Sequence, residues 1–158
     1  MAVRRIRVED DPILRMKCKE VREFNKGLEM LIDDMFDTMY KANGVGLAAP
    51  QIGILKRIVV IDDCDGHKFE LINPQIVEAE GEQVSTEGCL SLPNHIGEVK
   101  RPLKVTVRAF NKKGEEIEMH AEEQLAVIIS HELDHLEGIL YKDKATDYRL
   151  NDPQGKKR

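Results

Sequence analysis

The sequence His-Glu-Leu-Asp-His at residues 131–135 constrains the fold more than any other stretch of the chain. It lies in a run, residues 121–138, whose pattern predicts a helix. Residues four apart lie one above the other on one face of a helix, so His131 and His135 can bind the same metal ion. Glu132 is turned by about 100° around the helix axis, and it can reach a water at the metal without being a ligand. Two histidines and a general base in this spacing are typical of metallohydrolases.

The surroundings of Glu132 argue against a chance pair of histidines. On a helical wheel Leu125, Ile128, Ile129 and Leu136 form one apolar arc, and Glu132 lies in its middle. A carboxylate on a buried face is destabilising unless it is paired or takes part in chemistry. The pattern therefore favours a functional metal site over two surface or core histidines.

Periodicity in the rest of the chain predicts an α+β fold. Apolar residues recur at helical spacing between Asn25, a suitable N-cap, and about Ala42, and they predict a core-facing helix. We expect a mostly antiparallel sheet packed around the C-terminal metal-binding helix, with this second helix near the N-terminus. The expected strands are a short one at residues 4–8, a buried one at 57–62, one at 69–80 broken at Asn73-Pro74, and a hairpin of 103–110 with 115–120.

Length and composition exclude several classes of protein. The 158 residues carry no linker or internal repeat, so we expect one domain spanning residues 1–158. A net charge of −5 with scattered Lys and Arg gives no case for nucleic-acid binding. The chain has no apolar run of about 18 residues that would predict a transmembrane helix, and its charged N-terminus predicts no signal peptide. Three cysteines, an odd and small number, fit a reducing compartment.

The last residues of the chain give no pattern of regular structure. The segment 152–158 is polar and has no apolar stripe, so it is expected to fray, and residues from about 147 to 158 are expected to be dispensable for catalysis on short peptides. The sequence Asp-Pro-Gln-Gly at 152–155 argues against a C-terminal helix.

The loop at residues 44–49 formally matches the dinucleotide-binding pattern G-x-G-x-x-A. That fingerprint needs a strand before it and a helix after it, whereas here a predicted helix precedes it and Pro50 follows. We interpret its glycines as allowing a tight turn and a close backbone approach to a ligand. Gln51 is the polar side chain of this loop, and it is either a turn residue facing water or a working polar group.

A catalytic metal site usually has three protein ligands and one open position, so a third ligand is needed. Downstream candidates fail, because Tyr141 stands where a histidine would follow Gly138 and no glutamate follows Glu137. Upstream, Cys89 is the best candidate, since a thiolate and two imidazoles suit a divalent transition metal. His95 ranks second because its neighbours predict an exposed turn.

Three stretches together resemble the peptide deformylase family: residues 44–51, 87–91 and 131–135. They occur in the order found in that family and span most of the chain, and residues 11–15 resemble its N-terminal segment. The resemblance implies a metal-dependent hydrolase that removes the N-formyl group from the initiator methionine of new polypeptides and releases formate.

The resemblance also implies a role for each matching residue. Glu132 would be the general base and later the general acid. Gln51 and the backbone N–H of Leu90 would stabilise the oxyanion, and Gly46 would lie where the substrate backbone binds. The metal ligands would be Cys89, His131 and His135.

Two further positions follow from the resemblance. Glu87 and Arg101 would form an ion pair that orders the cysteine loop, by analogy with the family. Ser130 departs from the family pattern, which often has Gln before the first histidine.

Cofactor, partners and location are also implied by the resemblance. The ion would be one divalent metal, Fe²⁺ first, with Zn²⁺, Ni²⁺ or Co²⁺ compatible with the same ligands. The substrates would be N-formylmethionyl nascent peptides, with transient contact to the ribosome, and neither nucleic acid nor a membrane is expected as a partner. The location would be the bacterial cytoplasm, or an organelle after removal of a targeting segment.

Two other functions stay open on the residues alone. A metallopeptidase that cleaves internal peptide bonds would use the same helix. A non-enzymatic domain with a structural metal would need a fourth protein ligand.

Overall fold

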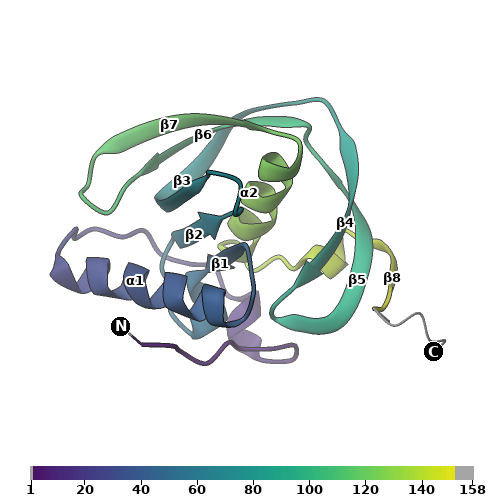
Figure 1. The fold of residues 1–158 in the computed structure, drawn as a ribbon, viewed down its shortest axis with the longest axis horizontal. Helices are drawn as coiled ribbons and strands as arrows, with labels where there is room; N and C mark the ends of the chain where they lie inside the picture. The colour runs from purple at the N-terminus through teal and green to yellow at the C-terminus, as the bar shows by residue number, and fades with distance from the viewer. Residues whose placement is uncertain (1, 152–158) are drawn as a thin grey trace.

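The computed structural model describes residues 2–151 and shows two antiparallel sheets with a helix between them (Figure 1). A five-stranded sheet has the order β1-β2-β3-β6-β7, and a three-stranded sheet has the order β4-β5-β8. The expected α+β class, with a mostly antiparallel sheet around a C-terminal helix, is confirmed. The strands are β1 (Gly46–Ala48), β2 (Ile58–Asp62), β3 (Lys68–Glu80), β4 (Gln83–Cys89), β5 (Leu92–Arg101), β6 (Lys104–Phe110), β7 (Glu116–Glu122) and β8 (Thr146–Leu150). The helices are α1 (Lys26–Lys41) and α2 (Gln124–His135), with 3₁₀ turns η1 (Pro12–Arg15), η2 (Ala49–Ile52) and η3 (Tyr141–Asp143).

Helix α1 forms where its cap and apolar stripe predict it. The Asn25 side chain accepts a hydrogen bond from the Leu28 N–H at 3.0 Å, which satisfies one of the free donors of the first turn. The apolar stripe, including the fully buried Met35 and Met39, packs against β1 and β2. Each such side chain contributes roughly 1.5–3 kcal/mol by burial.

Helix α2 is the element that the rest of the molecule encloses (Figure 1). It contacts β1, β2 and β7 of the large sheet and β5 of the small sheet. It begins at Gln124 and not at residue 121, because Ala121 still pairs with Val105 in the ladder between β7 and β6. Glu123, with a φ of 56°, makes the turn from strand to helix.

Two strand predictions need correction. Residues 4–8 form no strand; Arg4 is instead held by side-chain hydrogen bonds to Asp34, and the Arg7 N–H donates to the Gln51 carbonyl. The predicted break at Asn73-Pro74 is a local irregularity, and β3 continues through it. Asn73 adopts a φ of 52° there and its side chain makes two hydrogen bonds with the Val21 backbone.

The small sheet was not foreseen, and it changes the account of the C-terminal segment. Part of the segment expected to be dispensable for catalysis is ordered, because β8 pairs antiparallel with β5 and the Asn151 N–H donates to the Asn94 carbonyl. Residues 152–158, which were expected to fray without forming a helix, lie outside the described residues. Among residues 2–151, no helix has the length and apolar character needed to span a membrane.

Candidate metal and catalytic site

Three side chains from two elements meet at one point between the sheets. Cys89 ends β4, and His131 and His135 lie one turn apart on α2; their ligand atoms all lie within 4.8 Å of one another. The Cys89 Sγ lies 3.4 Å from His135 Nε2. A tetrahedral centre with ordinary metal–sulfur and metal–nitrogen bonds would separate such atoms by about 3.6 Å. The group therefore fits a divalent transition metal.

His95, the second-ranked ligand, is not part of this group in the described chain. The sequence suggested that His95 lies in an exposed turn, but it lies within β5. Its ring stacks on Tyr148, and its Nδ1 lies 3.0 Å from the Pro93 carbonyl oxygen.

A buried chain of charged groups orients the first histidine. His131 Nδ1–H donates to Glu87 Oε1 at 2.9 Å, which leaves Nε2 for a metal. Arg101 donates two hydrogen bonds of 2.8 Å to the same carboxylate and one of 2.8 Å to Asp134. The expected ion pair between Glu87 and Arg101 is confirmed; its extension to His131 and Asp134 was not predicted, because no local spacing links these positions.

The charges in this chain stabilise one another. Burial alone raises the pKa of Glu87, but hydrogen bonds from Arg101 and His131 more than offset it and lower the pKa to about 2. Glu87 is therefore a carboxylate that accepts from both partners. The bond to His131 also opposes the effect of burial on that imidazole, whose pKa is raised.

Glu132 lies beside the metal-binding group, and its environment differs from that of Glu87. Its side chain is buried and its Oε1 has no hydrogen-bond partner in the described part of the chain. Burial raises the pKa of Glu132 to about 7, and the negative charge of Glu87 adds to that effect. A methyl group on Gly46 would lie 2.6 Å from Glu132 Oε2, so glycine at residue 46 leaves room for the carboxylate.

Gln51 is a buried site residue, and its interpretation as a turn residue facing water is wrong. It is 1% exposed. Its Oε1 accepts from the Ala48 N–H at 2.9 Å, and its Nε2 donates to Ser91 Oγ at 3.0 Å and lies 3.7 Å from Cys89 Sγ. The fold thus brings Gln51 against the thiol from a loop 38 residues away. Ser91, whose hydroxyl accepts from this amide, lies in the stretch 87–91 that resembles the family, but no role was predicted for it.

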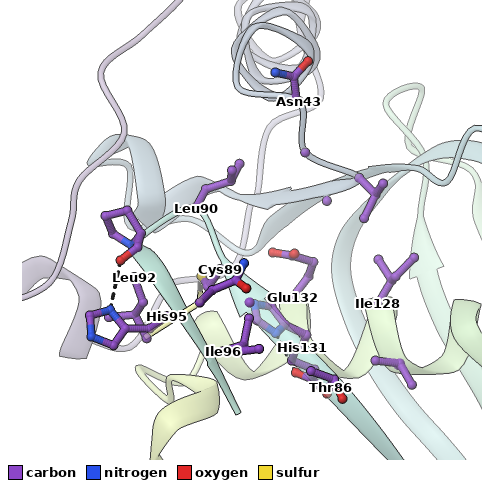
Figure 2. Close-up of a pocket in the computed structure, with 18 of the residues that line it drawn as sticks. Asn43, Thr86, Cys89, Leu90, Leu92, His95, Ile96, Ile128, His131 and Glu132 are labelled. Atoms are coloured by element: carbon purple, nitrogen blue, oxygen red, sulfur yellow. Dashed lines mark hydrogen bonds and ion pairs between the residues drawn. The ribbon is translucent and has the colours of Figure 1, made fainter. Parts of the chain in front are cut away.

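A cleft of about 480 Å³ opens over these residues. Figure 2 shows Glu132 and His131 at its centre, with Ile128 on one side and His95 on the other. Gly46 and Leu90 line the same cleft. A divalent ion in the cysteine–histidine group would face this opening with a buried acid beside it, which is the arrangement of a metal-dependent hydrolase.

Comparison with known proteins identifies which hydrolase family this is. Residues 3–151 match the family model described as polypeptide deformylase, and the chain belongs to the peptide deformylase family. It is a metal-dependent enzyme that removes the formyl group from N-formylmethionyl nascent peptides. This function excludes the metallopeptidase and the non-enzymatic structural-metal domain.

The relatives are similar over most of the chain. A peptide deformylase of Acetivibrio thermocellus is 54% identical over 158 residues, covering 100% of this chain and 92% of that protein. One of Caldicellulosiruptor bescii is 56% identical over 144 residues, covering 91% of this chain and 86% of that protein. The crystal structure of a Legionella pneumophila peptide deformylase has a TM-score of 0.89 at 44% identity, covering 92% of this chain and 88% of that one. The crystal structure of a Thermotoga maritima peptide deformylase has a TM-score of 0.90 at 40% identity, covering 92% of this chain and 99% of that one.

Proposed function

We propose that Cys89, His131 and His135 hold the metal of this deformylase and that Glu132 moves the proton. The observation that carries this assignment is the meeting of three ligand atoms within 4.8 Å beside a buried carboxylate that lacks a partner on one oxygen. A closed structural site would need a fourth protein ligand. The group found in the described chain has three, which leaves a position open toward the cleft.

The chain's own residues divide the remaining work. A bound metal supplies Lewis acidity, which lowers the pKa of a water and polarises a carbonyl. Glu132 accepts the proton of the attacking water and returns it to the nitrogen of the leaving amine. Its raised pKa brings its two protonation states close in energy near neutral pH, which suits a group that must both accept and donate.

Two hydrogen-bond donors stabilise negative charge on the formyl oxygen in the proposed scheme. Gln51 Nε2 lies 3.7 Å from the Cys89 thiol, on the floor of the cleft. The Leu90 N–H, next to the thiol, donates to no protein acceptor within the described residues. A donor of this kind can be worth about 3 kcal/mol in the transition state.

The shape of the cleft supports a small acyl group and an apolar first side chain. We place the substrate backbone along Gly46, where the absence of a side chain permits close approach. The methionine side chain would lie against Val45, Val127 and Ile128, which line one part of the cleft. A formyl carbon carries only a hydrogen, so it needs the least space of any acyl group beside the buried carboxylate of Glu132.

We further propose that the resident ion is Fe²⁺. The ligand set also suits Zn²⁺, Ni²⁺ and Co²⁺, so metal supply decides between them. Protein purified without oxygen should contain iron and lose activity in air, because a ferrous ion beside a thiolate is open to oxidation. One zinc per chain, with full activity that survives air, would contradict the assignment of iron alone.

We also propose that one domain spanning residues 1–158 acts in the bacterial cytoplasm and contacts the ribosome transiently. The support is that the relatives named above with more than half of their residues identical are bacterial and that the substrate is a nascent peptide. Co-sedimentation with ribosomes at low and physiological salt tests the contact, and protein that stays in the supernatant under both conditions would contradict it.

Release of formate from formyl-Met-Ala-Ser tests the site assignment directly. The holoenzyme should release formate from this peptide and should leave acetyl-Met-Ala-Ser intact, because an acetyl methyl group does not fit beside Gly46. Equal cleavage of both peptides would show that the proposed acyl position is wrong.

A further inference from the structure

Strand β8 reaches the rim of the substrate cleft. Leu150 is paired with His95 of β5, and the next residue, Asn151, donates its N–H to the Asn94 carbonyl at 2.8 Å. Asn94, His95 and Asn151 line the same cleft as Glu132. The chain that leaves the C-terminal strand therefore contributes Asn151 to the wall of the cleft, and β8 itself lies behind β5 of that wall.

Four aromatic rings run in contact from the metal-binding group to this wall. The ring of Tyr141 stacks on that of His131 at 5.8 Å and 27°, and Tyr148 of β8 meets Tyr141 edge to face at 5.8 Å and 62°. Tyr148 in turn stacks on His95 at 4.9 Å and 11°. Tyr141 is 1% exposed, so it is a rigid support for Tyr148.

The backbone of the small sheet is shaped to bring Tyr148 into this stack. Between the pairs Ile96–Arg149 and Glu98–Thr146, β8 has two residues where β5 has only Gly97, and this is a β-bulge. A methyl group on Gly97 would lie 2.9 Å from Ala145 Cβ and 3.4 Å from Tyr148 Cα. Glycine at residue 97 thus lets β8 lie close enough for the rings to touch.

The ring faces carry this packing, and the phenol groups contribute little to it. The hydroxyls of Tyr141 and Tyr148 are buried and have no hydrogen-bond partner in the described part of the chain. Phenylalanine at residue 148 should therefore keep the stack, whereas alanine should remove it. This difference separates a role of the ring from a role of the hydroxyl.

We propose that Tyr148 is a positioning residue that holds His95 and the β5 wall, and so determines how tightly the peptide residues after formylmethionine bind. The inference rests on the proposed function, in which the methionine side chain lies on the Ile128 side of the cleft. Figure 2 shows Ile128 and His95 on opposite sides of Glu132. A peptide anchored beside Ile128 therefore continues past Glu132 toward His95.

The test compares a short and a long substrate on the holoenzyme. For Tyr148→Ala, the KM for formyl-Met-Ala-Ser should rise about three- to tenfold, the range expected for loss of one aromatic pair. Its kcat, and its KM for formyl-Met-amide, should stay within about twofold of the parent. Tyr148→Phe should match the parent on both substrates. Gly97→Ala, which pushes β8 away from β5, should reproduce the selective rise in KM.

Controls separate this inference from general loss of packing and from the function itself. The rings of Phe24 and Phe110 are 5.9 Å apart and lie outside the cleft. Phe24→Ala removes this aromatic pair and should change the KM for neither the long nor the short substrate. If Tyr148→Ala does not fold, His95→Ala and Gly97→Ala give the same comparison. Equal losses on both substrates, a fall in kcat alone, or an unchanged KM for the long peptide would overturn the inference. The affinities of the parent and the variants for the peptide Met-Ala-Ser, measured by calorimetry, should rank the proteins in the same order without any turnover. Failure of the parent to release formate would therefore count against the proposed function only.

Discussion

At Glu132 a carboxylate is buried with no hydrogen-bond donor on Oε1 in the described chain, at a site where Gly46 leaves space for it. Burial of such a group costs several kcal/mol unless it is compensated. Glu87 accepts four hydrogen bonds, two from Arg101 and one each from His131 and Ser85, and its pKa is shifted in the opposite direction. Two carboxylates with different partners are thus suited to different tasks, one to orient a ligand and one to transfer protons.

Glu132→Gln should retain the metal and lose activity. The amide has the same shape but cannot accept and return a proton, so kcat should fall by about 10²–10⁴-fold, the usual contribution of general acid–base catalysis. Metal content and formate release, measured on the same preparation, check this. Loss of the metal in that variant would show that Glu132 is a ligand.

Gln51→Leu should lower kcat more than it raises KM, because an oxyanion donor acts mainly in the transition state. The expected loss in kcat is about 10²-fold or more. Gln83→Leu is a matched control, since the Gln83 amide donates to two backbone carbonyls outside the cleft. A weaker KM with unchanged kcat in Gln51→Leu would contradict the oxyanion role.

At the scale of elements, the hairpin of β4 and β5 is joined to α2 by one buried guanidinium. Arg101 is 2% exposed and bridges Glu87 on β4 and Asp134 on α2. The irregular pairing between Glu87 and Cys89 turns the thiol toward the two histidines. The metal site is therefore assembled where a hairpin and a helix meet, and its geometry depends on that contact.

Arg101→Met should destabilise the fold and weaken metal binding. In the described chain, removing the cation leaves Glu87 with only His131 and Ser85 as partners and Asp134 with only Lys144, and breaking a buried pair typically costs about 3–5 kcal/mol. Metal affinity should fall by about 10–100-fold, because Glu87 then orients His131 less firmly. Urea unfolding and metal competition measure the two effects.

Arg108→Met is the control. The ion pair of Arg108 with Glu118 is about half exposed, so its loss should lower the free energy of unfolding by less than about 1 kcal/mol. Equal effects of the two substitutions would mean that the bridge has no special role.

At the scale of the whole molecule, the fold gives the three cysteines three different environments. Cys64 is exposed on the turn between β2 and β3, and Cys18 is half-buried beside the core. Burial raises the pKa of the Cys18 thiol to about 11, which disfavours its reactive thiolate. Cys89 lies in the metal-binding group.

Alkylation with iodoacetamide should distinguish these thiols. In the folded holoenzyme Cys64 should react first, Cys18 slowly, and Cys89 only after the metal is removed with a chelator. Peptide mass spectrometry identifies the modified residues without any assay of activity. Alkylation of Cys89 at the same rate with and without metal would remove it from the ligand set, and Cys64→Ser provides a background with one fewer reactive thiol.

Several features follow from local order in the sequence. The cap and apolar stripe of α1 depend on residues within one or a few turns, so Asn25 and the residues up to Met39 predicted that helix correctly. The spacing of His131 and His135 needed only helical geometry to predict that both point one way. Hairpins such as β6–β7 were also predictable, since their pairing spans a short turn.

Only the tertiary structure decided how distant parts of the chain combine. It placed Cys89 beside His131 and His135, and it placed His95 on the wall of the cleft. The sequence could rank these two residues as candidates for the third ligand but could not decide between them. It also extended the Glu87–Arg101 pair to His131 and paired β8 with β5. These contacts join residues many positions apart, and their partners are selected by sheet register and by burial of charge, which no local period encodes. The sequence by itself thus determined the helices and the type of chemistry, and the fold decided which residues form the metal-binding group and which strand pairs with the β5 wall of the cleft.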